Sequence, residues 1–179
     1  MSNTSLFRFA GWSAILSILF SFGMFALISG GRGGAFMVVS IIASLFTLVV
    51  LYALFVFHRS QAATLSLAML VCGIVGMTLE NIGAGPDTPL GMVTSVVYGA
   101  TFLLIGYLGY SNAQMPHWLA ISAYVVGIAS LATAGASAVG QAGVTDIIPM
   151  VMFVAWIAWS IGIWRWFVSP ATAIATATA

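Results

Sequence analysis

The sequence AFMVVSIIASLFTLVVLYALFVF, residues 35–57, contains no charged residue and few polar ones. As an α-helix it would be about 34 Å long, which exceeds the hydrocarbon thickness of a bilayer, about 30 Å. In lipid, a helix satisfies its backbone hydrogen bonds internally, whereas an isolated strand does not. These residues therefore predict a transmembrane helix.

The composition extends this prediction to the rest of the chain. Four Lys or Arg and three Asp or Glu occur in 179 residues, of which 62% are hydrophobic. The mean hydropathy is +1.16. So few charges cannot cover a water-soluble surface, and lipid is therefore the expected solvent. The net charge of +1 also gives no electrostatic footprint for binding nucleic acid.

Six runs of about twenty mainly apolar residues follow one another, each long enough to cross a membrane. They lie near residues 8–28, 35–57, 63–82, 90–109, 117–135 and 147–168. Their connections are short, which makes consecutive helices antiparallel neighbours. We therefore expect one all-α domain over residues 1–169, a polytopic six-transmembrane-helix antiparallel bundle. For the Ala/Thr tail at 170–179, disorder and a strand bound by a partner both stay open.

The arginines predict the orientation of this bundle. Six spans place Arg8, Arg59 and Arg165 on one side of the membrane and Arg32 on the other. Basic residues concentrate in cytoplasmic loops. We therefore expect a multi-pass protein of the bacterial cytoplasmic (inner) membrane with both termini, and the 170–179 tail, in the cytoplasm.

Glu80 is the strongest candidate for a functional residue, because an ionisable group inside a span is a functional hypothesis by default. It shares a face of the third predicted span with Gly73 and Gly76. A face of small residues predicts packing on a neighbouring helix, so we expect Glu80 to point into the bundle. The alternative is a boundary glutamate satisfied by water, by Asn81 or by Arg32. The candidate ligand-binding residues are Glu80, Asn81, Thr94, Tyr98 and Thr101.

The last predicted span carries an aromatic shelf formed by Met152, Trp156 and Trp159. Both tryptophans lie nearer the middle of the membrane than the interface, where tryptophan is usually enriched. A pigment, a quinone or an isoprenoid could lie on this shelf, and so could a partner's helix. The alternative is ordinary core or lipid-facing packing.

Small side chains recur at three- and four-residue spacing in the fifth predicted span. Such a face lets a neighbouring helix backbone approach closely, and packing within the bundle is its simplest interpretation. The residues are Ala120, Ala123, Gly127, Ser130, Ala134 and Ser137.

Few residues suggest cofactor or catalytic chemistry. His58 and His117 lie on the same predicted side and could ligate one haem from opposite faces, although interfacial histidines beside arginine are ordinary. Two histidines and three carboxylates scattered over both sides do not make a typical metal site, and no metal ligand or catalytic residue is predicted. The lone Cys72 is most simply a small packing residue.

The segment GYLGYSNAQMPHWLA, residues 106–120, resembles the junction "GYL-Y…P-WLA" of a family of uncharacterised bacterial multi-spanning proteins, defined only as a domain of unknown function. The segments RFAGW at 8–12, 59–80 and IGIW at 161–164 are similar to further parts of that family. The family pattern has an arginine where this chain has Met77, and an acidic residue in the final span, which is apolar here around Ala155. The resemblance therefore implies the multi-spanning architecture, without a shared intramembrane ion pair and without a known activity.

These observations predict a non-catalytic integral membrane protein, an accessory or structural subunit that packs on a larger membrane complex or on a hydrophobic cofactor. Its expected partners are the lipid bilayer and either another membrane protein or further copies of itself. A small carrier or ligand-binding protein that uses Glu80 is the first alternative. A lipid- or isoprenoid-modifying membrane enzyme is the second, and the scarcity of acids, bases and metal ligands disfavours it.

Overall fold

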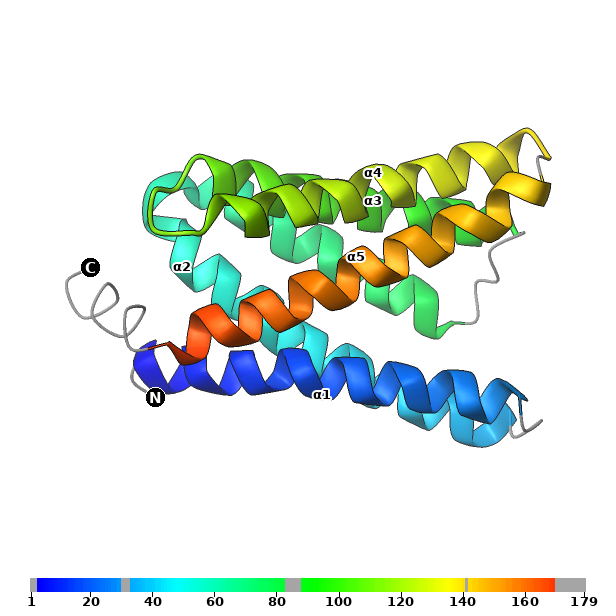
Figure 1. Cartoon of the computed structure of the whole chain (residues 1–179), viewed down its shortest axis with the longest axis horizontal. Helices are drawn as coiled ribbons and strands as arrows, with labels where there is room; N and C mark the ends of the chain where they lie inside the picture. The colour runs from blue at the N-terminus through cyan, green and yellow to red at the C-terminus, as the bar shows by residue number, and fades with distance from the viewer. Residues whose placement is uncertain (1–2, 30–32, 83–87, 141, 170–179) are drawn as a thin grey trace. The chain divides into compact units, whose positions relative to one another are not determined.

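A computed structural model of the chain describes residues 3–29, 33–82, 88–140 and 142–169. The elements are the helices α1 (Asn3–Ser29), α2 (Gly33–Asn81), α3 (Pro89–Tyr110), α4 (His117–Ala138) and α5 (Ala142–Val168) (Figure 1). All five are long and apolar enough to cross a membrane. The all-α prediction is confirmed for this part of the chain. Arg32, Asp87 and the 170–179 tail lie outside the described residues, as does the side chain of Asp146.

The chain divides into two compact units. Unit 1 comprises residues 1–53 and 160–179, and unit 2 comprises residues 54–159. Unit 1 thus contains α1, the first part of α2 and the end of α5. Unit 2 contains the rest of α2, then α3, α4 and the beginning of α5.

Helix α2 contains a break between the predicted helices at 35–57 and 63–82. Its 49 residues are two helices joined across a kink at Ala62, where the backbone leaves helical values (φ −151°, ψ 75°). Residues 58–61, where the turn was predicted, contain neither Gly nor Pro, the residues that most strongly end a helix, and they stay helical up to the kink. The break therefore lies one residue further along the chain than predicted.

The break in α2 lies against the connection between α3 and α4. The side-chain amide of Gln61 donates a hydrogen bond to the backbone oxygen of Ser111, with a nitrogen–oxygen distance of 2.9 Å. Helix α4 begins at His117, directly after Pro116, as the sequence predicted. The predicted turns at 58–61 and 110–116 therefore lie at the same end of unit 2.

In unit 1, α1 and the end of α5 run antiparallel. The rings of Phe7 and Phe167 have centroids 5.1 Å apart, and those of Trp12 and Trp164 are 5.7 Å apart. Residue numbers rise along α1 while they fall along α5. The start of α1 and the end of α5 therefore lie at the same end of this unit.

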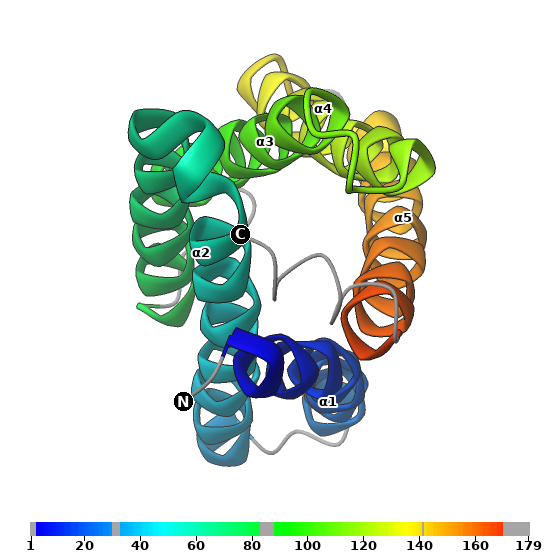
Figure 2. The same cartoon turned by 90° about the vertical axis from the view of Figure 1, so that its left-hand side faces the viewer.

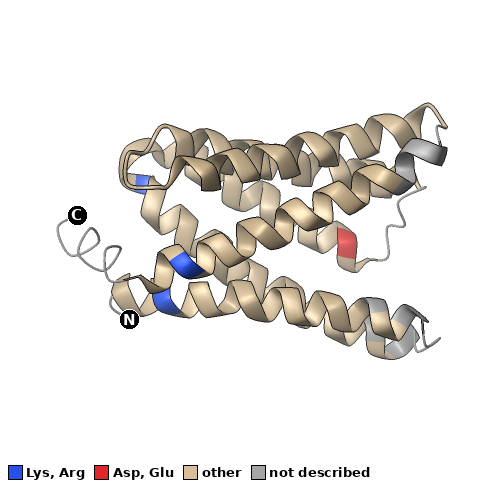
Figure 3. Ribbon diagram, viewed as in Figure 1, with Lys and Arg blue, Asp and Glu red and all other residues tan. Residues whose placement is uncertain are grey.

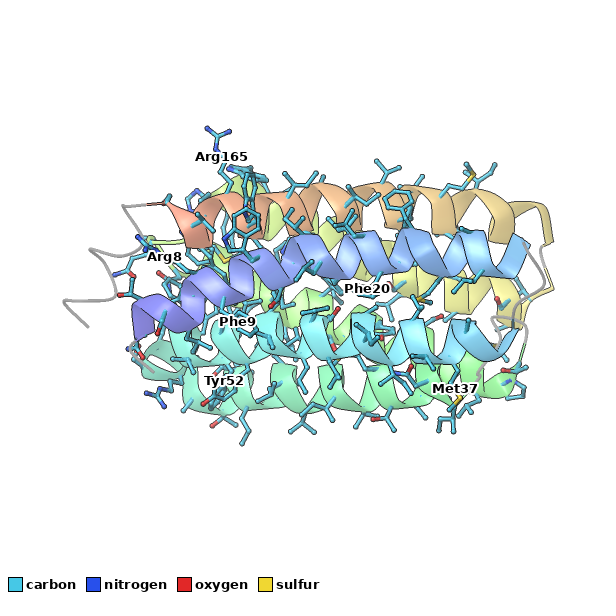
Figure 4. The ribbon with its side chains drawn as sticks, turned by 90° about the horizontal axis from the view of Figure 1, so that it is seen from below. Arg8, Phe9, Phe20, Met37, Tyr52 and Arg165 are labelled. Atoms are coloured by element: carbon cyan, nitrogen blue, oxygen red, sulfur yellow. The ribbon has the colours of Figure 1, made fainter. Side chains whose placement is uncertain are left out.

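The outer surface of unit 1 is apolar. Figure 4 shows α1 beside the first part of α2, where the rings of Phe20 and Phe46 lie 5.6 Å apart. The side chains of Phe9, Met37 and Tyr52 are 49%, 57% and 48% exposed. Large apolar groups gathered on a surface are unfavourable in water and are the normal covering of a helix in lipid.

Helices α3 and α4 approach closely in unit 2, as the end-on view of Figure 2 shows. A Cβ atom on Gly127 would lie 3.0 Å from the backbone oxygen of Gly99 and 3.0 Å from the backbone nitrogen of Leu103. A Cβ atom on Gly106 would lie 2.8 Å from the ring of Tyr124. The predicted small-residue face of α4 is buried at Ala120, Ala123, Gly127, Ser130 and Ala134.

We predict that Gly127→Ala lowers the free energy of unfolding by about 1–3 kcal/mol, because backbone atoms of α3 would have to move away from the added methyl group. Gly135→Ala, in the same helix, is the matched control, since a Cβ atom there meets nothing within 4 Å. The control should be neutral or stabilising by up to about 1 kcal/mol through helix propensity. Reversible unfolding of both variants in detergent measures the difference, and equal effects would contradict the close approach of the two helices.

Candidate functional site

Glu80 lies in the last turn of α2 and contacts Tyr98 of α3. The phenolic hydroxyl of Tyr98 donates a hydrogen bond to Oε2 of Glu80, with an oxygen–oxygen distance of 2.5 Å. A phenol is a natural donor to a carboxyl oxygen. The contact joins two helices through polar groups within an otherwise apolar region.

Gly76 makes this contact possible. A Cβ atom at Gly76 would lie 3.3 Å from both Cδ1 and Cε1 of Tyr98, so the tyrosine ring rests directly on the backbone of α2. Side chains four residues apart on a helix lie above one another on one face. The ring that covers Gly76 therefore carries its hydroxyl to Glu80, one turn further along.

The surroundings of Glu80 reproduce the predicted inward orientation only in part. Gly73 and Gly76 are buried, as expected for a packing face, and the Glu80 carboxylate contacts Tyr98 of the neighbouring helix. The Glu80 side chain is nevertheless exposed on the surface of the chain.

The other predicted members of this cluster bond within their own helices. Asn81 donates to the backbone oxygen of Met77 at 2.8 Å. Thr94 and Thr101 are buried, and each donates at 2.9 Å to the carbonyl four residues earlier. Such bonds satisfy a hydroxyl without an external ligand. Of the predicted cluster, the structure thus brings Glu80 and Tyr98 together across two helices.

The two members of the pair lie at different positions along their helices. Tyr98 is about 13 Å from Pro89 along the axis of α3, at about 1.5 Å per residue. Glu80 lies one residue before the end of α2. Both helices are long and apolar enough to cross a membrane, so the pair lies near one end of a candidate span.

The predicted aromatic shelf is not one open surface. Trp159 is 2% exposed, and its ring lies 5.1 Å from that of Phe102 in an edge-to-face arrangement. The sulfur of Met152 accepts a hydrogen bond from Ser130 at 3.2 Å. Trp156 is half-buried and stacks on Phe153. Two of the three shelf residues therefore contribute to packing inside unit 2, and no sequence pattern pointed to Phe102 as a partner.

The two histidines have different environments. His58 is fully buried, and neither ring nitrogen has a hydrogen-bond partner. His117 is exposed and stacks on Tyr110, with ring centroids 5.1 Å apart. A haem iron needs an open approach to an imidazole nitrogen on each face of the porphyrin, and protein atoms close that approach at His58. This arrangement does not fit a bis-histidine haem.

No other constellation for metal or covalent chemistry is visible in the described part of the chain. Among those residues, no three His, Cys, Asp or Glu side chains lie close enough together to hold a metal ion. Cys72 has a free thiol and is half-buried in α2. The Glu80–Tyr98 pair is therefore the candidate site.

The chain matches no protein-family model, and no curated protein and no solved structure is similar enough to match it. The family resemblance carried by residues 106–120 therefore stays a prediction.

We predict that Tyr98→Phe lowers the free energy of unfolding by about 1–3 kcal/mol, because the ring still covers Gly76 while Glu80 loses its donor. Unfolding in detergent measures the loss. Tyr107→Phe is the control, because Tyr107 lies in the same helix with its side chain 54% exposed. The control should stay within about 0.5 kcal/mol of wild type. A Tyr98→Phe variant as stable as this control would show that the hydrogen bond does not stabilise the fold.

Proposed function

We propose that this chain is a non-catalytic accessory subunit of a larger membrane assembly, with six spans and both termini in the cytoplasm of a bacterial inner membrane. The observation that carries the proposal is the exposed side chain of Glu80, bonded to Tyr98 of α3 near the end of a helix that is long and apolar enough to cross a membrane. A charged group in the membrane is unfavourable unless it faces protein or water. Burial of the Glu80 carboxylate against a partner subunit would remove this group from lipid.

The topology of this proposal rests on the length of α2. A helix of 49 residues would be about 73 Å long, more than twice the thickness of the hydrocarbon core. We therefore place two crossings in α2, one on each side of Ala62. With the four other helices crossing once each, the number of crossings is even, and both termini lie on one side.

The basic residues support the orientation. Arg8 and Arg165, drawn blue in Figure 3, lie at the same end of unit 1, where α1 starts and α5 ends. Arg59 is exposed beside the break in α2. Two crossings in α2 would put all three on the side of the termini, and an excess of arginine indicates the cytoplasm.

The two faces of this part of α2 differ in character. Ile74, Val75 and Ile82 are 42%, 43% and 66% exposed, and they form an apolar face that suits lipid. At about 100° per residue, Glu80 lies on the opposite face, with the buried Gly73 and Gly76. A partner that carries one cationic or N–H donor side chain would therefore approach Glu80 beside α3 rather than through the apolar face.

The test is purification of the chain from native membranes in mild detergent, with mass spectrometry of the co-purifying chains and native electrophoresis. We expect a stoichiometric partner, and a reduction of the complex by about tenfold or more in Glu80→Ala, because the partner's polar group would be left unpaired. Thr78→Ala, an exposed residue of the same helix on the face opposite Glu80, should leave the complex intact. A wild-type protein that migrates as a single chain, or full retention of the partner by Glu80→Ala, would refute the proposal.

The Glu80–Tyr98 pair also supports a second candidate function, a small carrier or ligand-binding protein. A carboxylate beside a phenol can hold a cation or a hydrogen-bond donor from a small solute. The same purification separates the two functions. A single chain that retains a small molecule, and that loses it in Glu80→Gln, would favour binding over assembly.

A further inference from the structure

His58 is a buried polar side chain without a partner. It is 0% exposed, and neither Nδ1 nor Nε2 has an atom in hydrogen-bonding geometry. Its ring meets the ring of Phe57 edge to face, at a centroid distance of 4.9 Å. A neutral imidazole has one donor and one acceptor nitrogen, and leaving both unpaired in the interior is unfavourable. Burial of the His58 imidazole without hydrogen bonds is therefore energetically unfavourable.

The other buried polar side chain near the break at Ala62 has partners within its own helix. Ser66 is fully buried, and its hydroxyl lies 2.9 Å from the backbone oxygen of Ala62 and 3.0 Å from that of Ala63. Such back-bonds satisfy the hydroxyl without any other group. His58 differs from Ser66 because neither of its polar atoms has a partner.

Gln61 lies about one helical turn from His58 and contacts the connection between α3 and α4. Its amide N–H donates to Ser111 in an exposed position, where water competes for the same groups. The same side chain is near enough to His58 to act on the imidazole, although outside hydrogen-bonding geometry. A small rotation at Ala62 would let Gln61 exchange Ser111 for His58.

We infer that the break in α2 is a hinge with two settings. In the observed setting, Gln61 is bonded to Ser111 and the His58 imidazole is buried without a partner. In the other setting, the bond to Ser111 is released and the imidazole is hydrogen-bonded to Gln61 or to water. Each setting makes bonds that the other lacks, so a substitution that removes a bond or an unpaired group from one setting shifts the balance between them.

Hydrogen exchange of the full-length protein in detergent, followed by mass spectrometry, tests the hinge through the amides of residues 58–66 and 109–116. Gln61→Ala removes the bond that holds the observed setting and should speed exchange by about two- to tenfold. His58→Leu removes the unpaired group that this setting buries, and should slow exchange by about fivefold or more. His58→Met is the second apolar variant, because its unbranched side chain adapts to the space if a leucine packs poorly there.

Gln114→Ala is the matched control, because Gln114 is an exposed amide side chain in the same α3–α4 connection. It should exchange at the wild-type rate. Faster exchange in both apolar His58 variants would mean that His58 stabilises the observed setting, and would overturn the inference. Unchanged exchange in Gln61→Ala would also overturn the inference, since the bond to Ser111 would then not stabilise the observed setting.

Discussion

The hydrocarbon core of a membrane offers no hydrogen bonds, so backbone groups that cross it must be satisfied within the chain. This constraint makes the comparison of helix length with bilayer thickness decisive for the architecture. Four of the five helices have 22 or 27 residues, which suits one crossing each. Helix α2 has 49 residues and a non-helical residue at Ala62, which divides it into two helical parts. The proposed number of crossings and the side of the termini both depend on that residue.

A second requirement is close approach between helices, which small residues supply. Gly99 and Gly127 bring α3 against α4, and Gly76 brings α2 against the ring of Tyr98. In lipid, where apolar side chains gain little from leaving the solvent, such backbone contacts and a few polar bonds hold helices together. At Gly76 a side chain would crowd the Tyr98 ring, at 3.3 Å from the added Cβ atom, so the glycine helps the Tyr98 hydroxyl to approach Glu80.

Several features of the fold and of the candidate site could be predicted from the sequence. Hydropathy predicted apolar spans, spacing of three and four residues predicted the buried face of α4, and Glu80 and Tyr98 were expected in one polar cluster. A break between residues 57 and 63 was also expected, and the structure has it at Ala62. No local signal showed that residues 58–61 stay helical up to that point. The exposure of Glu80 and the contact of Trp159 with Phe102 were equally hidden. Both depend on how aromatic side chains of separate helices pack together, and sequence patterns do not show this packing.

The most direct test of the account is the position of the α2 break relative to the membrane. In a Cys72→Ser background, single cysteines at Ser60 and Thr88 can be labelled with a membrane-impermeant maleimide in intact cells and in inverted vesicles. Both native side chains are exposed. Two crossings in α2 predict that Ser60→Cys reacts only in inverted vesicles and Thr88→Cys only from the outer face. Labelling of both positions from one face, or protection of Ser60→Cys from both, would contradict the six-span account.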